Sequence, residues 1–182
     1  MNDEQSAMNR PLPNSYWVIP RRLLAGEYPI GADYSDARIR LSRFREAGIN
    51  SFIDLTETGE MPEYRHLLPV HTKYQRSPIA DTQVPASAHQ ILELLSDIHA
   101  AIEAKRCLYV HCRQGIGRTG LVIGCYLADN GGGDGKLAIK ELNRLWAQSE
   151  RAASWPKVPQ TSEQLDYIRR WPKLKKSSQE TR

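Results

Sequence analysis

Short hydrophobic runs alternate along the chain with longer segments of helical periodicity. The runs hold aromatic and aliphatic residues over four to seven positions, which predicts strands. They cover residues 15–19, 23–26, 49–55, 70–76 and 107–112. The clearest helix is predicted for residues 88–105, where one apolar stripe consists of Ile91, Leu94, Leu95, Ile98, Ala101 and Ile102.

Further segments with helical spacing follow and precede this helix. Helices are predicted within residues 34–48, 119–130, 136–148 and 162–171. Gly48 is placed to stop the first of them and Pro172 to end the last. Segment 119–130 has almost no polar face, so we expect it at the centre of the fold. Strands that alternate with helices predict an α/β fold, with a central, mixed and largely parallel sheet flanked by helices.

Length and charge narrow the class of protein. A chain of 182 residues suits one domain, and 40% hydrophobic with 25% charged residues is an ordinary globular composition. The net charge is +4, but residues 169–182 alone carry six basic side chains against the single acid Glu180. The remainder is close to neutral, which argues against a nucleic-acid-binding surface. A solvated terminus, or a weak attraction to anionic membranes or acidic partners, accounts for the basic end.

The cysteines and the short apolar runs favour a reducing compartment inside the cell. Cys107, Cys112 and Cys125 are odd in number and form no Cys-x-x-Cys pair, which disfavours a disulfide framework and a zinc site. The N-terminus is too polar for a signal peptide, and no strongly apolar run is long enough to span a bilayer. We therefore expect a soluble, cytoplasmic protein. We also expect a monomer, and a mechanism that needs no metal and no cofactor.

The stretch HCRQGIGRTG, residues 111–120, carries the chemistry. It follows a predicted strand and precedes a predicted helix, so its backbone N–H groups and the helix N-terminus favour a bound anion. The glycines, Gly115, Gly117 and Gly120, let the backbone curve and approach closely. Arg118 offers a planar fork of donors that suits two phosphate oxygens. The stretch therefore predicts a phosphate site.

The same electrostatic field acts on the sulfur of Cys112. Inward N–H groups, a helix N-terminus and an arginine stabilise a thiolate, which is a nucleophile suited to phosphorus. Thr119 can donate a hydrogen bond to this sulfur and make it a better leaving group. His111 can fix the loop through its ring N–H.

Residues 111–120 resemble the signature loop of the cysteine-dependent protein tyrosine and dual-specificity phosphatases: His-Cys, five residues, then Arg and Thr or Ser. The resemblance implies a phosphatase-type fold, no metal, and phosphate binding by the loop residues Arg113, Gln114, Gly115, Ile116, Gly117 and Arg118. It covers most of 17–171, so we expect a phosphatase catalytic domain at 16–172, a flexible leader at 1–15 and a basic flexible tail at 173–182. The opening YWVIPRRLLAGEYP is similar to small bacterial and dual-specificity-like members.

The resemblance also implies partners for the loop. A general acid is expected about thirty residues before the cysteine, where SPIADTQVP supplies Asp81. Asp54 and Glu57 are rivals, but Asp54 is expected to be buried on a strand and Glu57 to brace the site. PQTSEQLDY resembles the glutamine loop that places the hydrolytic water, which leaves Gln160 and Gln164 as alternatives.

These residues predict a phosphomonoester hydrolase that works through a phosphocysteine. A protein tyrosine or dual-specificity phosphatase comes first. Phosphotyrosine and phosphoserine or phosphothreonine both stay open as substrates, because the chain lacks the long segment that forms a deep phosphotyrosine pocket. A phosphoinositide or inositol phosphate phosphatase is the alternative: Arg113 adds charge at the rim, although Ile116 stands where a lysine would be expected. A catalytically weak phosphate-binding module and a thiol redox protein are the other classes, and the second lacks a nearby cysteine partner.

Overall fold

The central sheet has five strands in the order β1-β2-β5-β3-β4. The computed structural model describes residues 9–31 and 33–180. The strands are β1 (Ser15–Ile19), β2 (Leu23–Gly26), β3 (Ser51–Asp54), β4 (Lys73–Arg76) and β5 (Leu108–His111). β1 and β2 pair antiparallel, and every other pair is parallel. The predicted mixed, largely parallel sheet is therefore confirmed.

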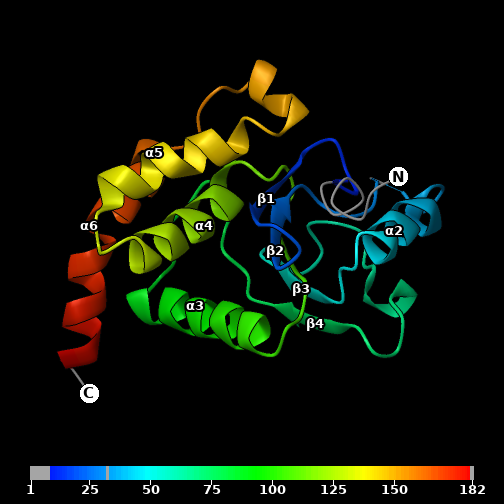
Figure 1. Ribbon diagram of the computed structural model, residues 1–182, viewed down its shortest axis with the longest axis horizontal. Coiled ribbons are helices and arrows are strands. Elements are labelled where there is room, and N and C mark those ends of the chain that lie inside the picture. Colours follow the sequence, from blue (N-terminus) through cyan, green and yellow to red (C-terminus); the bar gives the residue numbers. More distant parts are fainter. Residues whose placement is uncertain (1–8, 32, 181–182) are drawn as a thin grey trace.

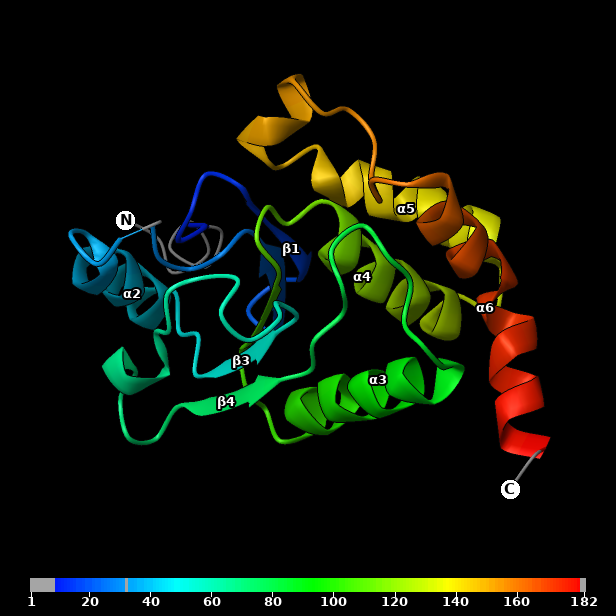
Figure 2. The ribbon, with the colours of Figure 1, turned by 180° about the vertical axis from the view of Figure 1, so that it is seen from behind.

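Helices cover both faces of this sheet (Figure 1). They are α2 (Ala37–Glu46), α3 (Ala88–Glu103), α4 (Gly117–Asn130), α5 (Gly135–Trp146) and α6 (Ser162–Glu180), with 3-10 turns η1 (Arg65–Leu67) and η2 (Glu150–Ala153). α2 lies on one side of the sheet, and α3, α4, α5 and α6 lie on the other (Figures 1 and 2). The α/β fold predicted from the alternating pattern is confirmed.

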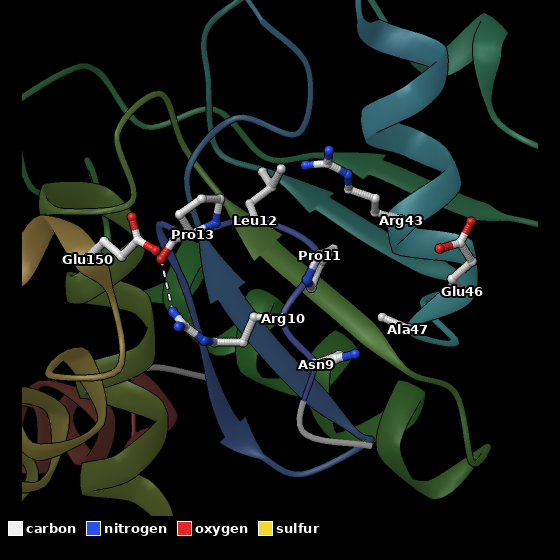
Figure 3. A pocket seen from close by; sticks show the side chains of 9 residues that line it. All are labelled: Asn9, Arg10, Pro11, Leu12, Pro13, Arg43, Glu46, Ala47 and Glu150. Carbon is white, nitrogen blue, oxygen red and sulfur yellow. Dashed lines mark hydrogen bonds between the residues drawn. The ribbon is translucent and has the colours of Figure 1, made fainter. Parts of the chain in front are cut away.

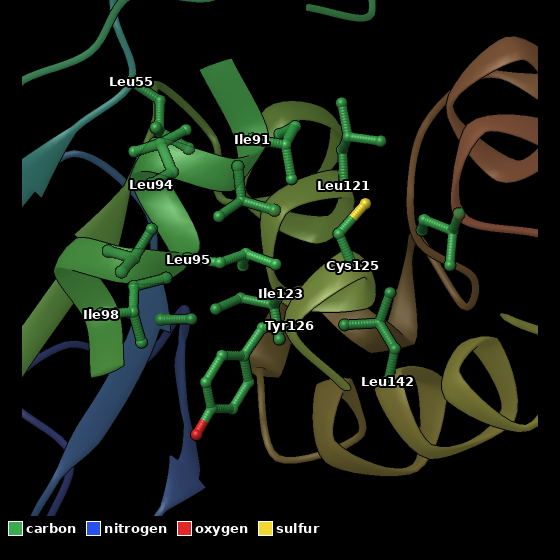
Figure 4. Close-up of a cluster of buried hydrophobic side chains, with 14 of the residues drawn as sticks. Leu55, Ile91, Leu94, Leu95, Ile98, Leu121, Ile123, Cys125, Tyr126 and Leu142 are labelled. Carbon is green, nitrogen blue, oxygen red and sulfur yellow. The ribbon is translucent and has the colours of Figure 1, made fainter. Parts of the chain in front are cut away.

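Alternate residues of the strands supply two hydrophobic cores. Leu108 and Val110 of β5 face the large core under α3, α4, α5 and α6, whereas Tyr109 faces the smaller core under α2. This alternation is expected of a strand that is buried on both faces. Figure 4 shows the large core, in which side chains of α3 and α4 meet. α4 is buried along most of its length, as its lack of a polar face predicted.

The two ends of the chain differ from the sequence prediction. The last helix continues through Pro172 to Glu180 instead of ending before the proline. Leu174 packs against the large core and Lys175 Nζ lies 2.6 Å from Asp129 Oδ1, and these contacts favour a helix beyond Pro172. The predicted basic tail at 173–182 is therefore helical as far as it is described.

Part of the predicted flexible leader packs against the domain. Residues 1–8 lie outside the described residues. Leu12 is buried in the smaller core, and Arg10 Nη1 donates a hydrogen bond to the Pro13 carbonyl (2.9 Å). Figure 3 shows residues 9–13 beside the C-terminal end of α2, with Glu150 on their other side. Residues 9–15 therefore contact the rest of the domain. The domain start at residue 16 stays a prediction.

None of the helices in the described part of the chain combines the length and hydropathy needed to cross a membrane.

Candidate active site

Cys112 lies at the carboxyl end of β5, the central strand of the sheet, and α4 begins five residues later at Gly117. Residues 112–118, called the phosphate loop below, therefore join the middle of the sheet to a helix N-terminus. The side chain of Cys112 is buried in the floor of this loop. The predicted strand, loop and helix all lie where the sequence places them, and the helix N-terminus is an anion-binding feature.

Gly115 gives the phosphate loop its curvature. Its φ is +76°, a conformation that residues with a Cβ rarely adopt. Its N–H donates a hydrogen bond to Cys112 Sγ at 3.3 Å. A Cβ at this position would lie 2.5 Å from the carbonyl carbon of Gly26. Only glycine therefore lets the loop press against the end of β2 with this N–H toward the sulfur.

The other predicted loop residues divide into exposed and buried groups. Arg113 and Gln114 are exposed at the rim. Ile116 is buried in the large core, so its backbone alone is available to a ligand. Thr119 Oγ1 lies 3.4 Å from the Gly26 carbonyl and donates to it, which differs from the expected hydrogen bond to the sulfur.

Arg118 is buried and is held by a carboxylate that the sequence analysis missed. Its Nη1 and Nη2 donate to the two carboxylate oxygens of Glu60 at 2.7 and 2.6 Å. Burial opposes the charge on Arg118, but the hydrogen bond to Glu60 and the nearby acidic groups together outweigh it and raise the pKa of Arg118. The same hydrogen bond lowers the pKa of Glu60. Arg118 Nε is buried and lacks a partner among the described residues, so one donor of the fork is available to a phosphate oxygen.

Glu60 takes the bracing role that was expected of Glu57. The backbone N–H of Glu57 instead donates to Glu60 Oε2 at 3.0 Å, which fixes the carboxylate from behind. Both acids occur in TETGE, a segment without periodicity, so spacing could not choose between them. The sequence signal for a carboxylate near the site was the group of acids that follows the predicted strand, and it did not distinguish Glu60 from Glu57.

Asp81 meets the phosphate loop at Arg118. Asp81 Oδ1 lies 3.1 Å from Arg118 Nη2, and the carbonyl of Ile79, two residues earlier, accepts a hydrogen bond from Arg118 Nη1 at 3.2 Å. The Asp81 side chain is 55% exposed, so it is open to a ligand and to water. The structure thus brings the predicted acid to the predicted arginine.

Asp54, the rival acid, has a different environment. It is fully buried and accepts hydrogen bonds from Thr56, Tyr74 and Arg76. Burial opposes its charge, but His111 and the hydrogen bonds outweigh it and lower the pKa of Asp54. Asp54 therefore stays an ionised structural group, and the expectation that it is buried on a strand is confirmed.

His111 connects this buried group to the cysteine. Its Nε2 lies 2.6 Å from Tyr64 Oη and its Nδ1 3.4 Å from the Cys112 carbonyl, while Asp54 Oδ1 is 4.0 Å from Nδ1. Burial dominates and lowers the pKa of His111. The ring is thus placed beside the start of the phosphate loop, and its part in fixing the loop stays a prediction.

The two candidate glutamines both lie against Gly117. A Cβ on Gly117 would be 3.1 Å from the side-chain oxygen of either one. The buried Gln164 accepts from the backbone N–H groups of Gln160 and Thr161 and donates to the Gln83 carbonyl at 3.1 Å. Gln164 therefore connects the start of α6 to the loop that carries Asp81 and Gln83, called the Asp81 loop below. Gln160, by contrast, is exposed.

The central part of the chain matches a known family. The family model described as "Tc-R-P: Polymorphic toxin system, DSP-PTPase phosphatase" covers residues 33–132. The chain belongs to this DSP-PTPase phosphatase family. The matched range includes Glu60, Asp81, Cys112 and Arg118 of the phosphatase site.

Known sequences and structures are similar to this DSP-PTPase family member. Protein 067L of Invertebrate iridescent virus 3, named a candidate tyrosine phosphatase, is 34% identical over 94 residues, which are 49% of this chain and 38% of that protein. The chain spans between 38 and 51% of the length of two viral relatives that it matches. Tk-PTP in its active form has a TM-score of 0.72 at 21% identity, covering 88% of this chain and 97% of that one. PTPMT1 in complex with PI(5)P gives 0.65 at 16%, covering 90% and 98%. The structural matches confirm the phosphatase-type fold.

Proposed function

We propose that the protein hydrolyses phosphate monoesters through a phosphocysteine intermediate. One observation carries the proposal. Arg118 lies between Glu60 and Asp81 in the loop that starts at Cys112, and its Nε has no partner in the described part of the chain. A fixed guanidinium beside a cysteine and an accessible carboxyl group supplies a phosphate ligand, a nucleophile and an acid together.

In the first step, Cys112 Sγ attacks phosphorus in line with the ester oxygen. The S–P bond forms as the P–O bond breaks, and Asp81 gives its proton to the departing oxygen. Arg118 and the N–H groups of the phosphate loop hold the three equatorial oxygens as charge spreads over them. The substrate alcohol or phenol then leaves.

In the second step, a water molecule attacks the phosphorus of the phosphocysteine. Asp81, now a carboxylate, accepts a proton from this water, and the Cys112 thiolate leaves as inorganic phosphate forms. Gln160 is proposed to orient the water, because its side chain is exposed beside Gly117. Gln164 is proposed to position the Asp81 loop instead, because its amide is already engaged there.

The proposed substrate is a phosphorylated protein, with phosphotyrosine and phosphoserine or phosphothreonine both allowed. Arg113 is exposed at the rim, but the buried Ile116 adds no further basic group at the position where a lysine would be expected. A phosphoinositide is therefore the second candidate. Hydrolysis rates on phosphopeptides and on inositol phosphates compare the two directly, and faster release from inositol phosphates would reverse their order. The cytoplasmic location and monomeric state also remain proposals.

The mechanism is tested with p-nitrophenyl phosphate. Cys112→Ser should abolish hydrolysis, and Asp81→Asn should lower kcat by about 10²-fold or more, the usual loss for a general acid. Asp166→Asn is the matched control, since Asp166 is an exposed acid that pairs with the exposed Arg169 on the surface of α6. Turnover by Cys112→Ser at the wild-type rate would contradict the mechanism. A wild-type protein that binds phosphate without turnover would instead be a phosphate-binding module.

A further inference from the structure

Arg151, in the segment between α5 and α6, contacts the phosphate loop from outside. Its Nη1 donates a hydrogen bond to the Gln114 carbonyl at 2.5 Å. In a trans peptide the C=O and N–H point in opposite directions, so a captured Gln114 carbonyl turns the Gly115 N–H the other way. That N–H is the one that lies 3.3 Å from Cys112 Sγ. Arg151 thus fixes a peptide plane that faces the nucleophile.

The guanidinium of Arg151 is itself held by a largely buried carboxylate. Its Nη2 lies 3.0 Å from Glu27 Oε2, and the Glu27 side chain is only 13% exposed. Asn14 joins the two residues: its Nδ2 donates to Glu27 Oε2 and its Oδ1 accepts from the Arg151 N–H, both at 3.0 Å. The Arg151 backbone and guanidinium are therefore held by contacts to three separate chain segments, at Asn14, Glu27 and Gln114.

The loop that carries Glu27 fixes the neighbouring peptide plane. The N–H of Tyr28 donates to the Arg113 carbonyl at 3.1 Å. Because the C=O and N–H of one trans peptide point in opposite directions, this bond turns the Gln114 N–H away from Tyr28. The Gly26 backbone closes the space beside Gly115. Two successive peptides of the phosphate loop are thus oriented by donors that lie outside it.

We infer that Arg151 is a positioning residue, which holds the Gln114–Gly115 peptide so that its N–H faces the phosphate and the sulfur. This inference rests on the proposed function, because it assigns Arg151 a part in the same site. Asn14, Glu27 and Arg151 all lie outside the residues that the family model matches. The phosphate loop, which lies inside the matched range, is therefore contacted by residues that lie before and after that range.

The first test measures inorganic phosphate binding by calorimetry. Arg151→Ala should weaken phosphate binding about tenfold, the scale expected when one charge-assisted hydrogen bond no longer orients a donor. Arg144→Ala is the matched control, because Arg144 is 67% exposed and pairs with Glu141 on the surface of α5. Wild-type affinity in a folded Arg151→Ala variant, or an equal loss in Arg144→Ala, would overturn the inference.

A second variant separates positioning from charge. Arg151→Lys keeps the positive charge, but a single ammonium does not reproduce the planar fork that spans Gln114 and Glu27. Its phosphate affinity should stay several-fold below wild type. Full affinity in Arg151→Lys would mean that charge alone acts, and would overturn the inference. This variant also decides the case if Arg151→Ala does not fold.

Hydrogen exchange of the Gly115 amide, followed by NMR, reports on the peptide plane itself. Exchange should be faster in Arg151→Ala than in wild type, with the amides of α3 unchanged. Unchanged exchange at Gly115 would overturn the inference. Neither measurement needs turnover, so a protein that binds phosphate with these dependences but hydrolyses no ester would contradict the proposed function and leave the role of Arg151 standing.

Discussion

Glu60→Gln removes one charge from the carboxylate that holds Arg118 while keeping its shape. In the structure Glu60 accepts two hydrogen bonds from the guanidinium, at 2.7 and 2.6 Å, and its side chain is only 16% exposed. A glutamine offers one oxygen, and its NH₂ group faces the second Nη as donor against donor. One charge-assisted hydrogen bond is lost and the other weakened.

The expected cost follows from these contacts. Hydrogen bonds to charged groups contribute about 1.5–3 kcal/mol each, so Glu60→Gln should lower the free energy of unfolding by about 2 kcal/mol. The less restrained Arg118 should lower kcat/KM by about tenfold to a hundredfold, or roughly 1.4–2.7 kcal/mol of transition-state stabilisation. Guanidinium unfolding and p-nitrophenyl phosphate kinetics measure the two quantities.

The same chain supplies a matched control on its surface. Glu141 accepts two hydrogen bonds from Nε and Nη2 of Arg144, at 2.8 and 2.6 Å, so it also makes a two-point contact with an arginine, but in an exposed place. Exposed pairs contribute about 0.2–1 kcal/mol, so Glu141→Gln should change stability by less than about 1 kcal/mol and leave kcat/KM unchanged. Equal effects of Glu60→Gln and Glu141→Gln would refute the reasoning from burial.

The pH dependence of the Glu60 effect has a fixed sign. Because Arg118 lowers the pKa of Glu60 in the folded protein, its contribution to stability is complete above the ordinary pKa of about 4.3 and is lost as pH falls through the folded value. The stability difference between wild type and Glu60→Gln should therefore be constant from pH 7 to about pH 5.5 and shrink below pH 4. A difference that is independent of pH would contradict an ionised Glu60.

Three further predictions concern other positions of the site. Gly115→Ala should lower stability by about 3 kcal/mol in denaturant unfolding, because a Cβ overlaps the Gly26 backbone and the φ of +76° is strained. Burial lowers the pKa of His111, so the unfolded state binds a proton first and wild-type stability should fall as pH drops below about 6.5. His111→Gln should remove that slope. In rapid-mixing kinetics, Gln160→Ala should slow the second step and accumulate phosphocysteine, whereas Gln164→Ala should slow both steps.

The sequence predicts the parts of the site that are contiguous. Cys112, the glycines and Arg118 occupy one short stretch, so the strand before it and the helix after it nearly determine their geometry. Asp81 was placed by the family resemblance, which implies a general acid about thirty residues before the cysteine, and by the prolines that flank it. The structure puts this carboxylate 3.1 Å from Arg118.

Other features depend on contacts that periodicity does not encode. Glu60 and Glu57 are indistinguishable in a loop, and only the folded backbone turns Glu60 toward Arg118. Pro172 is a helix breaker by local rules, yet tertiary contacts of Leu174 and Lys175 accompany a helix that continues past it. The Arg151 contact joins residues 37 positions apart and has no local signature.

Sheet order explains why these distant residues meet at one loop. In the parallel register Gly26 of β2 and Asp54 of β3 both pair with His111 of β5, so the segments that follow β2 and β3 emerge on either side of Cys112. The β2 side brings Glu27 and thereby Arg151 to the loop, and the β3 side brings Glu60 to Arg118. Because β5 is the last strand in sequence but central in the sheet, the segments that follow the earlier strands β2 and β3 lie on both sides of its loop. Each half of the phosphate loop therefore has its own carboxylate, one acting through Arg151 and one acting directly on Arg118.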